Sequence, residues 1–297
     1  MLLWDKTFYP EHAGKVFHVV PANSTFRGDV VKKYGSNNVF ISSSQQGIVN
    51  ALARTMTGRN DYVLIYPGTY TFSGVATDGV GITVSKSATI QSVTRNPADV
   101  NIVAGADAGI FSLAATADGF KLRDVSLTLD TSSTTPQDGI VVASGCDGVI
   151  IDNCNFIGAD KATVAIDSEA DRLIVQNCRF EDVKFAIQSN GAYSKILRNF
   201  VNSDNTAAVG IELTAGNWCE IFENHLDLSG GTGDTGIKVA NACLLGICKY
   251  NTIRATCNDP INPGSSTMAF IFNYLTGSTT TDFTVTNSTA LPRLVYT

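Results

Sequence analysis

The chain has 297 residues, of which 44% are hydrophobic and only 16% are charged. This composition excludes an intrinsically disordered protein, because disorder requires few apolar residues and a high charge. The formal net charge of −6 excludes the basic surface that a nucleic-acid partner needs. No run of 18 apolar residues occurs, so we expect no membrane-spanning helix.

The first residues contain no basic segment followed by an apolar stretch, so we expect no secretory signal. The chain has seven cysteines, an odd number without the spacing of metal ligands. We therefore predict reduced core thiols in a chain that folds in a cytoplasm, with no metal site and no cofactor. These cysteines are Cys146, Cys154, Cys178, Cys219, Cys243, Cys248 and Cys257.

Residues 1–40 show no repeat and carry three aromatic residues near their start, Trp4, Phe8 and Tyr9. They also hold His12 and His18, but a spacing of six residues without a Cys or acidic cluster is weak for a metal site. We predict a docking arm that either folds back on the rest of the chain or contacts another chain.

A single convincing helix is predicted over residues 43–57, within a capping segment 41–60. Ser43 and Gln46 have the spacing of a capping box, and Gly58 ends the helix. Its apolar stripe consists of Ile48, Ala51, Leu52 and Met56.

Residues 61–260 form the largest predicted domain, and a repeat runs through its second half. An asparagine recurs at Asn153, Asn177, Asn199 and Asn224, with spacings of 24, 22 and 25 residues. Such a period indicates a solenoid. A small residue followed by isoleucine repeats in step with it, at Gly139-Ile140, Ala165-Ile166, Ala186-Ile187, Gly210-Ile211 and Gly236-Ile237.

Short alternating runs of Val, Ile and Phe between Gly, Asn and Asp indicate strands and not helices. Each repeat is therefore predicted to be one coil of a parallel β-helix, with coils stacked about 4.8 Å apart. The four asparagines are predicted to form a hydrogen-bonded ladder at one corner, because asparagine tolerates the left-handed conformation. The ladder is expected to begin at Asp124 and to end at Tyr250.

The phase of the repeat predicts the direction of neighbouring side chains. Phe156 and Phe180 are expected to stack in the core, and Arg123 is expected beside Asp152. The residues one position after the ladder are expected to point inward; they are Cys154, Cys178, Phe200 and His225. The residues one position before it are expected to point outward, with Arg198 beside Glu223; they are Asp152, Gln176, Arg198 and Glu223.

Two polar insertions, residues 128–138 and 229–236, are predicted to be loops between coils. From Ile261 the repeat fades. Residues 261–297 are therefore predicted to form a β cap, with strands at 268–272 and 282–286.

The short helix, a Val/Ile strand and the turn Pro67-Gly68-Thr69-Tyr70 resemble the start of the pectate-lyase-like right-handed β-helix superfamily. The resemblance covers roughly residues 40–260 and is greatest to the β-helix proteins of bacteriophage particles, including tailspikes. It implies an all-β chain that forms one right-handed parallel β-helix, with the helix at 43–57 covering its open end.

The polysaccharide-cleaving enzymes of this superfamily carry motifs that are absent here, including Asn-Thr-Asp, Gly-His-Gly and Trp-x-Asp-His. The best local candidates are three acidic residues expected to cluster on successive coils, where carboxylates lie about 5 or about 10 Å apart. The alternative is that they are solvated turn residues. They are Asp160 beside Lys161, Asp182 near Lys184, and Asp204.

Two functions follow from these observations. The first is a structural component of a bacteriophage particle, made in the host cytoplasm, that assembles as a homotrimer and contacts other virion proteins through residues 1–40. The second is a tailspike-like protein that binds or degrades a host surface polysaccharide. The absent motifs favour the first, so we assign no catalytic residue from the sequence.

Overall fold

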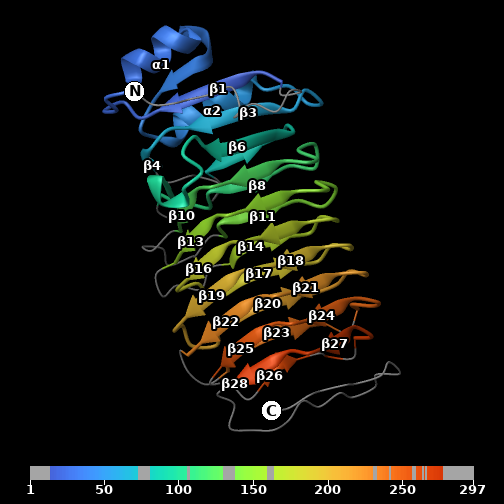
Figure 1. Ribbon diagram of the computed structural model, residues 1–297. Helices are drawn as coiled ribbons and strands as arrows, with labels where there is room; N and C mark the ends of the chain where they lie inside the picture. The colour runs from blue at the N-terminus through green and yellow to red at the C-terminus, as the bar shows by residue number, and fades with distance from the viewer. Residues whose placement is uncertain are drawn as a thin grey trace.

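The computed structural model describes residues 14–72, 81–105, 108–129, 138–158, 164–229, 233–240, 242–255, 259–262, 264 and 266–276. These residues form three parallel sheets, A, B and C, that wind into an elongated solenoid (Figure 1). The predicted all-β parallel β-helix is therefore confirmed. Its right-handed sense stays a prediction.

Each coil contributes one strand to each sheet in the order A, B, C. Sheet A contains, in spatial order, β2 (Val39–Ile41), β1 (Val16–Val20), β3 (Asp61–Ile65), β6 (Ala88–Ser92), β9 (Lys121–Arg123), β12 (Ile150–Asp152), β15 (Ile174–Gln176), β18 (Lys195–Leu197), β21 (Glu220–Phe222), β24 (Ile247–Lys249) and β27 (Ala269–Ile271). Sheet B contains β4 (Gly68–Thr71), β7 (Val100–Val103), β10 (Ser126–Thr128), β13 (Asn155–Ile157), β16 (Arg179–Glu181), β19 (Phe200–Ser203), β22 (His225–Leu228), β25 (Thr252–Ala255) and β28 (Tyr274–Thr276). Sheet C contains β5 (Ile82–Val84), β8 (Phe111–Leu113), β11 (Ile140–Val142), β14 (Val164–Ser168), β17 (Phe185–Ser189), β20 (Val209–Leu213), β23 (Thr235–Val239) and β26 (Asp259–Asn262).

The repeated pairs of a small residue and isoleucine lie in sheet C, in the predicted register. A Cβ atom on Gly139 would lie 2.6 Å from Leu129 Cδ2 and 2.7 Å from the carbonyl oxygen of Ala165 on the next coil. A glycine at this position therefore allows consecutive coils to pack closely, where a larger side chain would collide with the next coil. The paired isoleucines are Ile140, Ile166, Ile187, Ile211 and Ile237.

Sheet A is bounded by two corners, each marked by a left-handed residue in every regular coil. At the A–B corner, between sheets A and B, φ lies between 51° and 57° in Asp124, Asn153, Asn177, Arg198, Glu223, Tyr250 and Phe272. At the C–A corner, between sheets C and A, φ lies between 57° and 70° in Gly119, Gly148, Arg172, Tyr193, Trp218 and Leu245. Asp124 and Tyr250 thus occupy the A–B corner, as predicted.

The prediction of one ladder through four asparagines is wrong by one residue. Sheet A pairs Gln176 with Leu197, so Asn177 is equivalent to Arg198 and not to Asn199. The register advances by 21 residues there, whereas the two asparagines are 22 apart. Asn153 and Asn177 therefore occupy the left-handed corner, while Asn199 and Asn224 occupy the next position, which faces inward.

The inward asparagines do form a ladder, which continues past Asn224 to Asn251 and Asn273. The Nδ2 of Asn199 donates to Oδ1 of Asn224 (3.0 Å), and Asn224 donates in the same way to Asn251 (3.0 Å). Asn251 donates to Asn273 (2.9 Å). The first three asparagines are almost fully buried, so this ladder satisfies polar groups inside the solenoid.

The core contains the predicted stack of Phe156 and Phe180, with ring centroids 4.7 Å apart. Cys154 and Cys178 point inward, as predicted. Phe200 and His225 also stack, at 5.1 Å, but they lie on the outer face of sheet B. Their predicted inward direction is wrong, because the one-residue shift reverses the face of every later side chain in the strand.

Neighbouring outward residues follow the same register. Asp152 lies beside Arg123, as predicted, with the carboxylate 3.9 Å from Nε. Asp152 and Gln176 are paired on the outer face of sheet A. Arg198 and Glu223 are equivalent on consecutive coils, as predicted, but they lie at the corner and not in the strand.

Much of the predicted arm belongs to the solenoid. β1 pairs in parallel with both β2 and β3, so residues 16–41 fold back on the chain. The short helix α1 (Arg27–Tyr34) connects β1 to β2, through a 3-10 helix at Ser36–Asn38. A second 3-10 helix covers Pro97–Asp99. Trp4, Phe8, Tyr9 and His12 lie outside the described residues.

The predicted helix is α2 (Gln45–Arg54), and it packs Ile48, Ala51 and Leu52 into the core beside β1. The predicted capping box does not form. Ser44 is the N-cap residue, without a side-chain cap, and Ser43 Oγ instead accepts a hydrogen bond from the Ala22 amide. Met56 follows the helix and is exposed. That α2 caps the solenoid stays a prediction.

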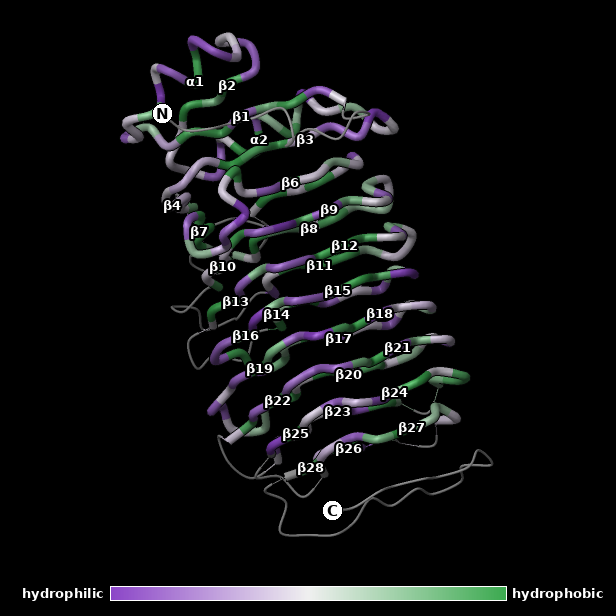
Figure 2. Tube along the Cα trace, viewed as in Figure 1, coloured by the Kyte–Doolittle hydropathy of each residue, from purple (hydrophilic) through white to green (hydrophobic). Residues whose placement is uncertain are grey.

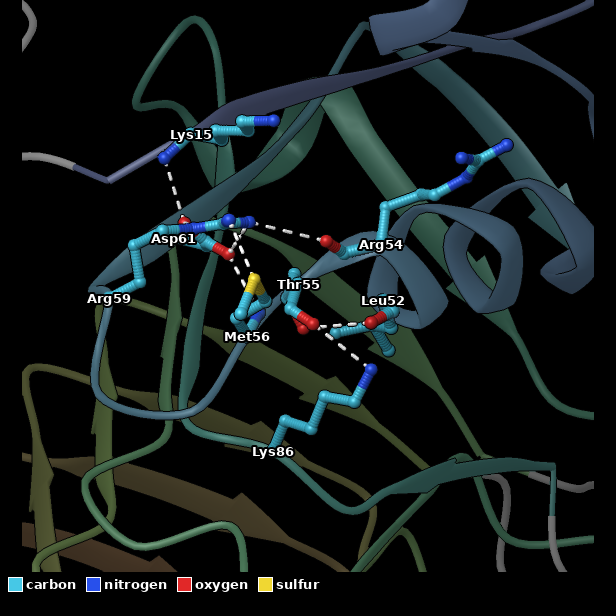
Figure 3. A network of polar contacts seen from close by, with 8 residues as sticks. All are labelled: Lys15, Leu52, Arg54, Thr55, Met56, Arg59, Asp61 and Lys86. Atoms are coloured by element: carbon cyan, nitrogen blue, oxygen red, sulfur yellow. Dashed lines mark hydrogen bonds and ion pairs between the residues drawn. The ribbon is translucent and has the colours of Figure 1, made fainter.

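A buried carboxylate ties α2 to the first strands (Figure 3). The side chain of Asp61 is fully buried and accepts hydrogen bonds from the amides of Lys15 (2.7 Å) and Met56 (2.8 Å). The guanidinium of Arg59 binds both of its oxygens, each at 2.6 Å. Burial raises the pKa of Asp61, but these hydrogen bonds outweigh it and hold the pKa below its usual value.

The register continues past Ile261, where it was expected to fade. β26, β27 and β28 add a further strand to each sheet. The strand predicted at 282–286 lies outside the described residues. Six of the seven cysteines are free and buried, as predicted, and Cys257 lies outside the described residues.

Candidate functional site

The outer face of sheet C carries a line of side chains from consecutive coils. In each coil the inward isoleucine is followed by an outward residue, because side chains alternate along a strand. Strand pairing places these residues side by side in neighbouring coils, about 4.8 Å apart. They are Val141, Asp167, Gln188, Glu212 and Lys238. We call these residues, together with Asp138, the sheet C strip.

Asp138 and Asp167 are half-buried acidic residues on consecutive coils, where Asp138 is level with Val164, three residues before Asp167. Asp138 lies two residues before Ile140, and its Oδ1 accepts a hydrogen bond from the Val164 amide on the next coil (3.3 Å). Burial raises the pKa of Asp138, and the Val164 hydrogen bond partly opposes it. Burial, followed by the charges of Asp138 and Glu169, raises the pKa of Asp167.

Burial raises both pKa values, but the other influences on the two carboxyl groups differ. The amide of Val164 stabilises the charged form of Asp138. Asp167 faces two like charges, which favour its neutral form. A carboxylic acid beside a carboxylate is the arrangement used for acid–base chemistry on glycosidic bonds.

The strip continues with a connected polar chain. Gln188 Nε2 donates to Glu212 Oε2 (3.2 Å), and Lys238 Nζ lies 2.7 Å from Glu212 Oε1. Glu212 is only 7% exposed, and its carboxylate contacts both Gln188 and Lys238. Gln188 and Lys238 thereby present donors in fixed positions, which suits recognition of hydroxyl groups.

Of the three acidic residues weighed as candidates, Asp182 and Asp204 do not occupy equivalent positions in their coils. Glu181 pairs with Asn202, so Asp182 is equivalent to Ser203, and Asp204 comes one residue later. Asp204 is exposed in the turn that follows β19. The ammonium of Lys184 lies over the ring of Phe185, 6.0 Å from its centroid. Asp160 and Lys161 lie outside the described residues.

The strip was missed although the sequence contained a signal for it. The residue after the recurring isoleucine is polar in four coils, at Asp167, Gln188, Glu212 and Lys238. Once the isoleucine is placed inside, that residue must lie outside. Asp138 had no such signal, because it stands at the end of a polar insertion.

A cavity of about 310 Å³ lies between α2 and β5, lined in part by Leu52, Thr55 and Val84. The ammonium of Lys86 at its edge donates to the carbonyl oxygen of Thr55 (3.0 Å, Figure 3) and to that of Ala53 (3.0 Å). This charge stabilises the C-terminal end of α2. The cavity therefore lacks a free charged group to recognise a ligand.

Within the described ranges, no group of three or more His, Cys, Asp and Glu side chains is arranged to hold a metal ion. His18, one of the histidines weighed from the sequence, is buried with its ring against Tyr34. In the part of the chain that the structure describes, no helix is long and apolar enough to span a membrane.

No protein-family model matches the chain, and no curated protein matches its sequence. Solved structures match its fold. The deglycosylated pectin methylesterase from Aspergillus niger has a TM-score of 0.50 at 14% identity, covering 97% of this chain and 93% of that one. A penultimately deglycosylated form of that enzyme gives 0.49 at 14% identity with the same coverage. Pectate lyase Pel9A gives 0.42 at 13% identity, covering 90% of this chain and 78% of that one. At this identity the likeness shows the fold alone: the chain shares its fold with the pectin methylesterase.

Proposed function

We propose that the protein binds a linear polysaccharide along the sheet C strip and cleaves its glycosidic bonds with Asp138 and Asp167. The observation that carries this proposal is the presence of two half-buried carboxyl groups, Asp138 and Asp167, on consecutive coils of the same sheet, where burial also raises both pKa values. The strip supplies one outward side chain per coil in a straight line. A linear sugar chain also repeats at short, regular intervals, so it suits a surface of this shape.

The two aspartates take different roles in this proposal. Asp167, opposed by the charges of Asp138 and Glu169, keeps its proton and donates it to the leaving oxygen of the glycosidic bond. Asp138, whose carboxylate accepts a hydrogen bond from the Val164 amide, acts as the base or nucleophile on the other side of that bond. Gln188 and Lys238 hold the neighbouring sugar units.

The charge of the strip selects among polysaccharides. Asp138, Asp167 and Glu212 are acidic, whereas Lys238 is the single cation of the strip and is already paired with Glu212. A polyuronate would be repelled by this surface. The substrate class proposed is therefore a neutral or amino-bearing glycan.

Asp167→Asn tests the proposal, with Asp204→Asn as the matched control. Both variants are assayed on a fixed panel of neutral, amino-bearing and acidic polysaccharides. Binding is followed by affinity electrophoresis and cleavage by release of reducing ends. We expect the Asp167 variant to lose cleavage at least 100-fold while binding is retained, and the control to match the native chain.

Three results would overturn the proposal. One is that the native chain neither binds nor cleaves any member of the panel. Another is equal activity of the Asp167 variant and the native chain. The third is release of ester groups without chain cleavage, which would reject the glycosidic reaction.

A second proposal is the one favoured by the sequence, a structural component of a bacteriophage particle that acts by assembly. The observation that supports it is the large number of exposed apolar side chains on the last coils of sheet A. Its test is recovery of the protein from purified particles. Its absence from them, with activity on a glycan in the supernatant, would reject the structural role.

A further inference from the structure

The outer face of sheet A and its two corners change character along the solenoid. Among the described residues, twelve large hydrophobic side chains are exposed, and eight of them lie between residues 193 and 274. The turn that leads into β24 is coloured as hydrophobic in Figure 2. Ile247 is in a strand of sheet A and Tyr274 begins β28 of sheet B, while the others lie at or beside the two corners: Tyr193, Trp218, Leu244, Leu245, Tyr250 and Phe272.

Exposed apolar side chains gathered on the last coils of a folded chain indicate an interaction site. Its composition is that of a protein interface, because Trp and Tyr are mixed with aliphatic side chains. A sugar ligand would use the aromatic rings but would gain little from Leu244, Leu245 and Ile247. The surface therefore fits a protein partner.

Charges on this face are arranged in opposite pairs on neighbouring coils. Lys195 in β18 and Glu220 in β21 are paired in the sheet, with Nζ and Oε1 3.2 Å apart. Arg198 and Glu223 occupy the A–B corner of the same two coils. In both pairs the positive residue is on the coil of β18 and the negative residue is on the coil of β21.

We propose that a second copy of this chain covers the face, related by a twofold axis that runs parallel to the strands between β18 and β21. This rotation reverses the order in which the coils of the partner are stacked. It leaves the position of each residue along its strand unchanged. Lys195 then faces the partner's Glu220, and Arg198 faces the partner's Glu223. Each contact occurs twice, as it must in a twofold interface.

The same axis brings together the apolar side chains nearest to it. Tyr193 faces the partner's Trp218 at the C–A corner, and Leu197 faces the partner's Phe222 in the strand. One coil further out, Ile174 faces the partner's Ile247. The equivalence of these positions follows from the strand register.

The remaining positions contain no clash of like charges. Gln176 faces the partner's Lys249, and Arg172 faces the partner's Leu245. In the outermost coils, Asp152 faces the partner's Ile271. Charge complementarity therefore favours a second copy over an unrelated partner.

The face is large enough for a specific contact. It comprises six strands, β12 to β27, with three on either side of the axis. Six strands span about 29 Å and the six residues between the corners span about 20 Å, so each copy covers about 570 Å². The total of about 1,100 Å² reaches the size of a specific interface, about 1,000 Å² or more.

The experiment uses the full chain and measures mass in solution by analytical ultracentrifugation. The native chain is expected to sediment as a dimer of twice its 31.5 kDa mass. Lys195→Glu alone and Glu220→Lys alone each place like charges across the axis. Each is expected to raise the dimer dissociation constant at least tenfold.

Mixing the two variants isolates the contact between chains. Within each variant chain residues 195 and 220 carry like charges, so the ion pair between them in one chain is lost in both variants. Between the two chains, however, every contact across the axis again joins opposite charges. We expect the equimolar mixture to form a heterodimer, with a dissociation constant near that of the native homodimer.

The matched control is the ion pair between Asp227 and Arg254, which lies on sheet B and also joins adjacent coils. Asp227→Lys is expected to leave the dimer unchanged. A monomeric or trimeric native chain would overturn the inference. So would variants that do not associate when mixed, provided that circular dichroism shows both to be folded. These outcomes do not depend on whether the sheet C strip acts on a glycan.

Discussion

Arg198 donates a hydrogen bond from Nε to Oδ1 of Asn177, across 3.1 Å, and both residues occupy the left-handed A–B corner of consecutive coils. An arginine and an asparagine are therefore interchangeable at this corner. What the corner requires is the backbone conformation and outward room, and both Tyr250 and Phe272 also meet that requirement. The inward position that follows is more demanding, because a polar group there must find its partners inside the protein.

The same substitution at the two positions should have different costs. Asn224→Asp removes the donors to Ile196 O (2.9 Å) and Asn251 Oδ1 (3.0 Å) and buries a carboxylate, at an expected cost of about 3 kcal/mol or more. Asn177→Asp changes an exposed side chain and should cost less than about 1 kcal/mol. Urea unfolding measures both. Equal costs would contradict the two-ladder register.

His18 should make the stability depend on pH. Burial, with the charge of Lys33, lowers the pKa of His18 to about 4 from its ordinary value of 6.5. Its ring lies against Tyr34, with centroids 3.9 Å apart, and Tyr66 Oη lies 3.3 Å from Nδ1. As the pH falls, His18 is therefore protonated in the unfolded chain before it is protonated in the folded chain.

Stability should therefore decline as the pH falls from 6.5 to 4, by an amount on the order of 3 kcal/mol. His18→Phe keeps an aromatic ring against Tyr34 and removes the titration. Chemical unfolding of both chains at several pH values measures the difference. The prediction fails if the variant and native chain show the same slope between pH 4 and 6.5.

Two glycine-to-alanine changes should have opposite signs. A Cβ on Gly210 would lie 2.7 Å from the carbonyl oxygen of Gly236 on the next coil, so Gly210→Ala should cost about 1 to 3 kcal/mol. Gly28 lies in α1 with nothing within 4 Å of an added Cβ. Gly28→Ala should stabilise the chain by up to about 1 kcal/mol. Thermal unfolding distinguishes them, and a stabilised Gly210 variant would contradict the close approach of the coils.

The buried thiols should be unreactive in the native protein. Burial raises the pKa of Cys146 to about 11, and burial, with the neighbouring Cys219, raises the pKa of Cys243 to about 11. Little thiolate is then available at neutral pH. A thiol reagent added to denatured, unreduced protein should count at least six thiols, and these should react slowly before denaturation. A count below six would show that at least one of the described cysteines is in a disulfide.

The sequence by itself determined the type of fold and the residues that fill its core. Isoleucine recurs after a small residue in every regular coil, and sheet C uses that register without change. Such periodicity is a local property, since a strand's alternation fixes which side chains are buried. Phe156 and Phe180 could be paired for the same reason.

Only the tertiary structure decided the register of the A–B corner and the place of the candidate site. Because coil lengths vary, asparagines at similar spacing occupy two adjacent positions, the left-handed corner and the inward position after it. This shift of one residue places Phe200 and His225 on the outer face of sheet B and not in the core. Asp138 and Asp167 are 29 residues apart in the chain, with an insertion before one and a variable turn between them. Their approach depends on how strands from separate coils pair, because parallel pairing joins residues whose separation the local sequence does not specify.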